Sequence, residues 1–316
     1  MNSPRQPRVT EVAFTKNEGR FLLEWIAYHR LIGVTDFLIY TNDCEDESPA
    51  LLDRLQEMGI VAHVPNPRRP DEQPQNAALS AALAHHLVIG ADYVLQIDPD
   101  EFLVVKSERG AIQDLIAAAP EADVIAVQMR FIGDSGLARL GSGLVVEQLI
   151  QSSREDFGQN AIIKSLARND PRFIKVTANH LPGFDPAQGW IPRIFNADGR
   201  EIVPESFNRE RFRHMPEAYR SMRHAQLNHY CVRTPADFQA KKYRGTAANN
   251  DAKLHRQFFD LRNRNDVEDK TILAHAPATK AVMAEWLSDP ILAGRNRRCF
   301  EAYEGILRKA QMLFES

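Results

Sequence analysis

The sequence predicts an α/β protein built on a mainly parallel sheet. Short apolar segments alternate with helical segments over the first hundred residues. Polar residues follow the ends of several of these apolar segments, where a sheet would meet solvent. The 316 residues, 44% hydrophobic and 26% charged, are enough to bury one large core. Strands that alternate with helices imply βαβ units, and therefore parallel strands with helices on the faces of the sheet.

The first strand is expected at Val9–Phe14, which is short, apolar and rich in β-branched residues. A helix should follow, because Phe21, Trp25, Tyr28 and Ile32 recur at a spacing that puts them on one face. The same reasoning predicts further strands at Asp36–Tyr40, Ile60–Val64 and Tyr93–Ile97, and helices at Ala50–Met58 and Asn76–Val88.

The second half of the chain is less regular. Strands are expected at Val124–Met129, near Ile162–Leu166 and at Phe173–Val176, and the arginine-rich residues 202–223 are interpreted as a loop or a mobile segment. From Pro235 onward the pattern is helical, with helices expected at Asp237–Tyr243, Asp251–Leu261, Thr279–Leu287 and Arg298–Phe314. We therefore expect a catalytic α/β domain over residues 8–235 and a helical extension over 236–316 that packs on it.

Composition narrows the class of partner. The formal net charge of -3 gives no general attraction to nucleic acid, and a small molecule or glycan is favoured instead. The three cysteines, Cys44, Cys231 and Cys299, form no CxxC pair, which fits a reducing compartment. No apolar run reaches the length of a membrane span, and the first eight residues lack the apolar core of a signal peptide. We expect a cytoplasmic protein, with peripheral contact to the inner face of a membrane left open.

Three polar segments follow expected strands: residues 16–18, 42–46 and 98–101. In parallel sheets the ligand lies beyond the carboxyl ends of the strands. The three segments should therefore converge on one edge of the sheet and form a site there.

The segment Asp98-Pro99-Asp100-Glu101 gathers three carboxylates at the end of an apolar strand. Strand alternation sends Asp98 and Asp100 to the same side. Two like charges that close need a compensating cation or a raised pKa. Mg²⁺ or Mn²⁺ suits such a pair, and as a Lewis acid it would neutralise charge on a departing diphosphate. The competing interpretation is an acidic surface turn.

An ordered set of motifs resembles the DUF23-type glycosyltransferases, related to families 2 and 92. The resemblance covers about residues 9–245. Its pieces are Lys16-Asn17-Glu18, Glu24 to His29, Leu31 to Val34, Ile39 to Asp43, Asp98 to Phe102, Phe131 to Gly136, Ile163 to Ser165, Asn179-His180, Asn228 to Tyr230, Phe238, and Lys242 to Gly245.

This resemblance implies the GT-A fold and metal-dependent transfer of a sugar from a nucleotide diphosphate sugar, with UDP as the expected nucleotide and inversion at the anomeric carbon. The acceptor, a glycan or a lipid-linked molecule, is not identified, and neither are the sugar and the oligomeric state. Asp134-Ser135 stands where the family has two serines, so the donor-sugar or acceptor contact of that loop is an open question.

The resemblance also implies residue roles. Lys16, Asn17 and Glu18 would contact the nucleoside, with Glu18 and Asp46 as hydrogen-bond acceptors. Asp98 would face the ribose or a metal-bound water, and Asp100 would bind the metal. His229 would complete the metal shell, and Lys242 and Arg244 would hold the diphosphate. Inverting transfer needs a general base, for which Asp156 and Asp185 are candidates.

Each role has a structural alternative. Glu18 and Asp46 could stabilise helix N-termini, His229 could be a core histidine, and Lys242 and Arg244 could be a solvated helix face. The arginines Arg209, Arg211, Arg213, Arg220 and Arg223 could be solvated, or could contact an anionic acceptor or a lipid head group.

Two other functions compete with glycosyl transfer. A nucleotidyltransferase that acts on sugar phosphates would also use paired carboxylates, although residues 15–19 are not the glycine-rich basic loop that such enzymes carry after the first strand. A nucleotide- or glycan-binding module that has lost catalysis is the second. The intact Asp98 and Asp100 pair speaks against it.

Overall fold

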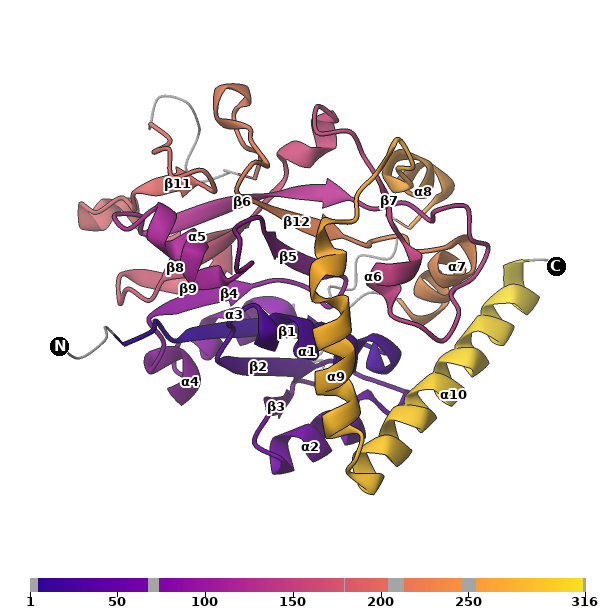
Figure 1. Ribbon diagram of the computed structural model, residues 1–316. Coiled ribbons are helices and arrows are strands. Elements are labelled where there is room, and N and C mark those ends of the chain that lie inside the picture. Colours follow the sequence, from indigo (N-terminus) through magenta and orange to yellow (C-terminus); the bar gives the residue numbers. More distant parts are fainter. Residues whose placement is uncertain (1–4, 68–73, 179, 204–212, 246–253, 315–316) are drawn as a thin grey trace.

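The computed structural model describes residues 5–67, 74–178, 180–203, 213–245 and 254–314. Within these residues a nine-stranded mixed sheet forms the centre of the molecule (Figure 1). The path through the sheet is β3-β2-β1-β4-β8-β6-β12-β5, and β11 pairs with β6. The expected α/β class is thereby confirmed.

The first half of the sheet is a parallel unit. It contains β1 (Val9–Thr15), β2 (Asp36–Thr41), β3 (Ala62–Pro65) and β4 (Tyr93–Gln96). β1 pairs in parallel with β2 and β4, and β2 with β3. β1 is buried along its whole length, which explains why its sequence is apolar or β-branched at most positions.

The second half of the sheet contains antiparallel pairs. β8 (Ile163–Arg168) runs antiparallel to both β4 and β6 (Val124–Phe131). β12 (Ala225–His229) runs parallel to β6 and antiparallel to β5 (Glu101–Val105), and β11 (Ile194–Asn196) runs parallel to β6. Because β1, β4, β6 and β12 therefore share one direction, their carboxyl ends meet at the same edge.

Two short antiparallel pairs complete the strands. β9 (Phe173–Ala178) pairs with β10 (Leu181–Phe184), and β7 (Gln151–Ser152) pairs with β13 (Val267–Glu268).

Helices cover both faces of the sheet. One face packs against α1 (Gly19–Leu31), α2 (Ser48–Glu57), α5 (Ile112–Ala118), α9 (Ala276–Trp286) and α10 (Pro290–Phe314). The other face packs against α3 (Pro74–Ala82) and α4 (His86–Ile89). The remaining helices are α6 (Val145–Gln148), α7 (Pro235–Arg244) and α8 (Arg256–Arg262), and in Figure 1 α7 and α8 lie on the side of the molecule toward which β12 points.

The expected C-terminal helical extension is present, and it is tied to the sheet domain. Leu292, Tyr303 and Leu307 of α10 belong to the same buried cluster as Phe21 and Trp25 of α1. The division of the chain at residue 235 remains a prediction, and the cavity described below takes residues from both sides of it.

The boundaries of several elements differ from expectation. The helix expected at Asn76–Val88 is two helices, α3 and α4, and the helix expected from Arg298 begins eight residues earlier, at Pro290. Only the end of the helix expected at Asp251–Leu261 can be compared, because residues 251–253 lie outside the described part of the chain. Strand β12 was not anticipated. In the part of the chain that the structure describes, no helix combines the length and the apolar character needed to cross a bilayer.

Candidate functional site

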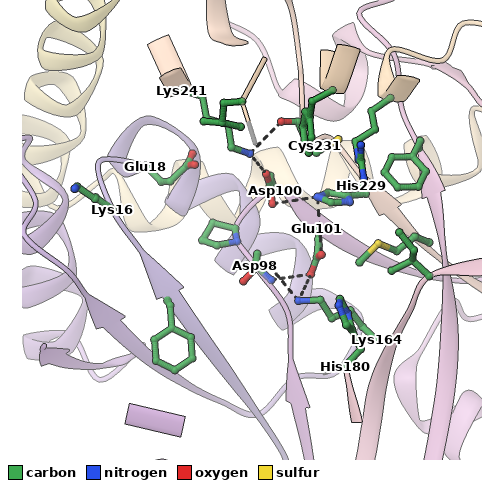
Figure 2. A pocket seen from close by; sticks show the side chains of 18 of the residues that line it. Lys16, Glu18, Asp98, Asp100, Glu101, Lys164, His180, His229, Cys231 and Lys241 are labelled. Atoms are coloured by element: carbon green, nitrogen blue, oxygen red, sulfur yellow. Dashed lines mark hydrogen bonds and ion pairs between the residues drawn. The ribbon is translucent and has the colours of Figure 1, made fainter. Parts of the chain in front are cut away.

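A cavity of about 270 Å³ opens at the edge where the carboxyl ends of β1, β4, β6 and β12 meet. Figure 2 shows the side chains around it, with Lys16 and Glu18 on one side and His229 and Lys164 on the other. Two of the three polar segments expected at this edge, residues 16–18 and 98–101, contribute lining residues. The described residues that line the cavity include six cationic and four acidic side chains: Lys16, Lys164, Arg213, Lys241, Arg244 and Arg262, and Glu18, Asp98, Asp100 and Glu101.

The acidic segment after β4 is a turn and not a continuation of the strand. β4 ends at Gln96, and the Glu101 amide donates to the Asp98 carbonyl at 2.9 Å. The Asp98 amide in turn donates to Glu101 Oε2 at 2.9 Å. Strand alternation, from which Asp98 and Asp100 were expected on one side, therefore does not apply here, because turn geometry has no period of two. Both residues nevertheless line the same cavity.

Lys164 of β8 neutralises the first part of this turn. Its Nζ lies 3.1 Å from Asp98 Oδ2 and 3.1 Å from Glu101 Oε2. The carboxyl of Glu101 is nearly inaccessible, and burial, opposed by Lys164 and reinforced by Asp98 and Asp100, raises its pKa to about 8. The ammonium group of Lys164 is therefore shared between the carboxyl groups of Asp98 and Glu101, and that of Glu101 is buried.

Asp100 is paired with a different lysine. Lys241 of α7 places its Nζ 2.7 Å from Asp100 Oδ2 and 3.0 Å from the Cys231 carbonyl oxygen. Burial would raise the pKa of Asp100, but Lys241, His229 and Arg233 outweigh it and hold this pKa well below its usual range. Asp100 is therefore a stable buried carboxylate in the described structure.

His229 reaches the cavity because of strand register. In the β12–β5 pair it lies opposite Glu101, and in the β12–β6 pair opposite Phe131. Its Nε2 lies 3.7 Å from Asp100 Oδ1 and 3.9 Å from Glu101 Oε1, too far for hydrogen bonds. Burial lowers the pKa of His229 to about 4, despite the nearby Asp100, so the imidazole is neutral near pH 7.

The residues predicted to bind a metal do lie together, but they do not form a metal site as they stand. Among the described residues, no group of three or more His, Cys, Asp and Glu side chains is arranged to hold a metal ion. The lysines already provide the positive charge that the sequence argument assigned to Mg²⁺ or Mn²⁺, because Lys164 pairs with Asp98 and Lys241 with Asp100. The described donor set therefore does not fit the ion.

Glu18 is held between two arginines. Arg233 Nη1 lies 3.1 Å from Glu18 Oε2, and Arg244 Nη2 pairs with Glu18 Oε1. Burial opposes ionisation, but the two arginines prevail and lower the pKa of Glu18. Arg244 also donates to the Lys16 carbonyl oxygen, so α7 is fastened to the end of β1. Glu18 makes no side-chain cap to α1, and its helix-terminus interpretation is not supported.

Asn17 and Asp46 join the loop that follows β1 to the loop that follows β2. Asn17 Oδ1 accepts from the amides of Glu45 and Asp46, and Asp46 accepts from Gly19 at 3.1 Å and from Ser48 at 2.9 Å. These are the first residues of α1 and α2, so Asp46 satisfies amides at two helix N-termini. Neither Asn17 nor Asp46 lines the cavity, and the geometry favours the structural interpretation of Asp46.

Three other predicted residues lie outside the cavity lining. Lys242 does not line it, whereas its neighbour Lys241 does. Asp156 is exposed and lies 3.4 Å from Arg154, and Asp185 accepts from the Ala187 amide at the start of a short 3₁₀ helix. The geometry gives no support to Asp156 or Asp185 as the general base. Arg209 and Arg211 of the arginine-rich segment lie outside the described residues.

The loop Gly133–Gly136 is hydrogen-bonded to two other segments of the chain, residues 263–265 and 150–151. Asp134 Oδ2 accepts from Asn263 at 2.7 Å, Asp134 Oδ1 accepts from Asn265 at 3.0 Å, and the Ser135 hydroxyl accepts from the amides of Ile150 and Gln151. The Asp134-Ser135 pair thus stabilises the loop and does not line the cavity.

Three cavity or near-cavity residues were not identified from the sequence: Lys241, Arg233 and Arg262. The sequence could have indicated Lys241 in place of Lys242, because residues three apart on a helix share a face. Lys241 precedes Arg244 by three positions, whereas Lys242 precedes it by two. No periodic pattern identifies Arg233, because it lies in the loop between β12 and α7, where its φ is 50°.

Comparison with known proteins agrees with the resemblance seen in the sequence. Residues 9–137 match the model of glycosyltransferase family 92, a region that includes the 16–18 and 98–101 segments. A glycosyltransferase family 92 protein of Ricinus communis is 29% identical over 130 residues. The match covers 39% of this chain and 22% of the relative, so the chain spans only about a fifth of the curated protein's length. The resemblance is confirmed for the N-terminal part of the chain.

Solved structures give partial overlaps. Glucosyl-3-phosphoglycerate synthase from Mycobacterium tuberculosis, solved with Mn²⁺, UDP and glucosyl-3-phosphoglycerate, is 17% identical with a TM-score of 0.27, over 38% of this chain and 43% of that one. A 4-diphosphocytidyl-2C-methyl-D-erythritol synthase is 15% identical with a TM-score of 0.32, over 65% of this chain and 96% of that one.

Proposed function

We propose that the protein is a glycosyltransferase that binds a nucleotide diphosphate sugar in this cavity and transfers the sugar to a second substrate. The observation that carries the proposal is the position of the family-matched segments. Residues 16–18 and 98–101 lie within the match to glycosyltransferase family 92 and line the same cavity. The lining also supplies cations suited to a diphosphate, including Lys16 and Lys241.

The parallel half of the sheet supports placing the nucleotide beside β1. The β1-α1-β2-α2-β3 segment is a βαβαβ unit, the arrangement that binds mononucleotides beyond its strand ends. Lys16 stands at the end of β1 and forms no ion pair with a described carboxylate. Its ammonium group is therefore available to a phosphate, which lysine binds as a point charge.

The leaving nucleotide gains negative charge as the bond to the sugar breaks. Cations fixed beside it stabilise that charge more in the transition state than in the bound substrate. We assign this role to Lys16 and Lys241. Arg244 holds Glu18 and the Lys16 backbone, so we assign it to positioning.

Finer features of the proposal come from the family resemblance. They are UDP as the nucleotide, inversion at the anomeric carbon, and a glycan or lipid-linked acceptor. No general base is assigned, because each described carboxylate in the cavity is paired with a cation. The Mn²⁺ or Mg²⁺ requirement and the cytoplasmic location, with or without peripheral membrane contact, remain predictions from the sequence.

A donor panel tests the proposal. UDP, GDP, CMP and their sugar conjugates are added to the protein in two buffers, one with Mn²⁺ and one with EDTA, and thermal shift and donor hydrolysis are measured. A ligand at 100 times its dissociation constant should add about 2.7 kcal/mol to the free energy of unfolding. We expect UDP and at least one UDP-sugar to stabilise the protein, and the two buffers show whether the metal requirement applies.

The panel also separates the competing functions. Release of pyrophosphate from a nucleoside triphosphate and a sugar phosphate would instead identify a nucleotidyltransferase. Stabilisation without any hydrolysis or transfer would indicate a binding module. If no nucleotide shifts the melting temperature in either buffer, the proposed function is wrong.

A further inference from the structure

The cations of the cavity differ in how they are neutralised. Lys164, Lys241 and Arg244 each pair with a carboxylate of the lining. Lys16, Arg213 and Arg262 form no ion pair with any described carboxylate. Since His229 is neutral near pH 7, the described lining carries excess positive charge, and a ligand with more than one negative group would balance it.

Of these three, Arg262 packs against aromatic rings. It is the last residue of α8, its guanidinium lies 4.1 Å from the centre of the Phe258 ring, and its distance to the Phe131 ring is 5.6 Å. Burial lowers the pKa of Arg262. A half-buried guanidinium on an aromatic surface retains its in-plane N–H donors for a planar or tetrahedral anion.

The position of Arg262 is fixed by the loop after β6. The next residue, Asn263, donates to Asp134 Oδ2 at 2.7 Å and accepts from the Asp134 amide at 2.8 Å. Gly133 permits this contact, because a Cβ there would lie 2.4 Å from the Arg264 carbonyl oxygen. The end of α8 is thus held in place before any ligand arrives, which reduces the entropic cost of binding.

Arg262 lies in the half of the cavity opposite the expected nucleotide. Phe131, which it faces, ends β6 and packs against His229 at the end of β12, with 5.5 Å between the ring centres. Lys16, in contrast, follows β1 in the parallel unit. An anion bound by Arg262 would therefore belong to the second substrate and not to the donor.

We propose that Arg262 forms an anion subsite for the acceptor, so that the acceptor carries a carboxylate or a phosphate monoester near the hydroxyl that receives the sugar. This inference rests on the proposed function, since it names the substrate class of the same cavity. The guanidinium would bind the acidic group through paired N–H donors, and exclude neutral analogues because they would leave a half-buried cation without a partner.

The test uses matched probes on the UDP-loaded protein. Methyl glucuronide is compared with methyl glucoside, and glycerol 3-phosphate with glycerol, by ligand-observed NMR titration. We expect the anionic member of at least one pair to bind at least about tenfold more tightly, which is the size of one charged hydrogen bond. The two pairs show whether the acidic group is a carboxylate or a phosphate.

Two variants on the same helix locate the effect. Arg262→Gln should remove the preference for the anionic probe, and Arg262→Lys should restore it in part, because charge returns without the planar fork. Arg256→Gln is the control, since Arg256 is exposed, pairs with Asp260 and does not line the cavity. Melting temperatures of all variants confirm that they are folded.

The outcomes separate this inference from the proposed function. UDP affinity should be the same in wild type, Arg262→Gln and Arg256→Gln. A loss of UDP affinity in Arg262→Gln would assign Arg262 to the donor diphosphate and overturn the inference. Equal binding of anionic and neutral probes would overturn it as well. Failure of UDP to bind the wild-type protein would contradict the proposed function instead.

Discussion

Lys241 and Asp100 are 141 positions apart in the chain, yet Nζ of Lys241 lies 2.7 Å from Oδ2 of Asp100. The pair joins α7 to the acidic turn after β4, and both side chains are largely buried. A buried carboxylate whose partner is removed keeps its charge only at considerable cost, or attracts another cation. The first prediction uses this property.

Lys241→Gln should increase the response of the protein to Mn²⁺. The substitution leaves Asp100 without its ammonium partner, so a divalent ion no longer competes with Lys241 for that carboxylate. We expect added Mn²⁺ alone to raise the melting temperature more in Lys241→Gln than in wild type. Lys242→Gln, which changes the lysine that the sequence pattern favoured, is the comparison and should respond like wild type. Equal responses in all three proteins would show that Lys241 does not occupy the place of the ion.

Glu18→Gln should destabilise the protein at pH 7 by about 3–5 kcal/mol, because it leaves two buried arginines without their shared counter-charge. The pKa of Glu18 is lowered in the folded state. Its stabilisation is therefore present above the unfolded value of 4.5, and is lost as the pH falls through the folded value.

Urea unfolding between pH 7 and pH 3 tests this dependence. The difference between wild type and Glu18→Gln should shrink as the pH falls. Glu57→Gln is the control, since Glu57 is exposed and pairs with Arg54 on the same helix. A difference that stays constant with pH would contradict the ion-pair account.

Asp46→Ala should reduce stability by about 1–2 kcal/mol and leave UDP affinity unchanged. The substitution removes the acceptor for the amides of Gly19 and Ser48 at the starts of α1 and α2. Chemical denaturation and UDP titration measure the two quantities. Glu45→Ala changes an exposed neighbour and serves as the control. Normal stability with weakened UDP binding would favour the nucleoside contact that the family resemblance implies.

Gly133→Ala should cost about 1–3 kcal/mol through overpacking, because the new Cβ would lie 2.4 Å from the Arg264 carbonyl oxygen. Moving that segment also displaces Arg262, so binding of the anionic probes should weaken. Gly158→Ala is the matched control, since no atom lies within 4 Å of a Cβ there and its φ is not positive. Calorimetry and the probe titration together test the prediction, and unchanged probe binding would mean that this loop does not position Arg262.

The sequence predicted the sheet and the edge that carries the cavity because both follow from local patterns. Strands alternate with helices, and polar segments follow the strands, so residues 16–18 and 98–101 were placed together correctly. The acidic segment was also identified correctly, but its geometry was not. A turn that begins two residues after β4 breaks the alternation on which the shared-side argument depended.

The cations of the site were harder to predict, because their partners are remote. Arg233 pairs with Glu18 across 215 positions, and no local pattern relates the two. The choice between Lys241 and Lys242 depends on a helical rotation of about 100° between adjacent residues, so an error of one position turns the side chain away. The position of His229 could not be predicted from the local pattern either. It lies opposite Glu101 because of the register of β12, a strand that was not expected from the sequence.

The acidic and the cationic members of the cavity's ion pairs come from different parts of the chain, and the acidic members are synthesised first. Carboxylates come early, between Glu18 and Glu101, whereas the cations that pair with them come late, between Lys164 and Arg244. A nascent chain that ends before Lys164 would hold four acidic groups and none of these partners. Burying them at that stage would be costly, so the parallel half of the sheet can assemble on the ribosome while this edge stays hydrated. The cavity should close last, when α7 and α8 emerge and dock.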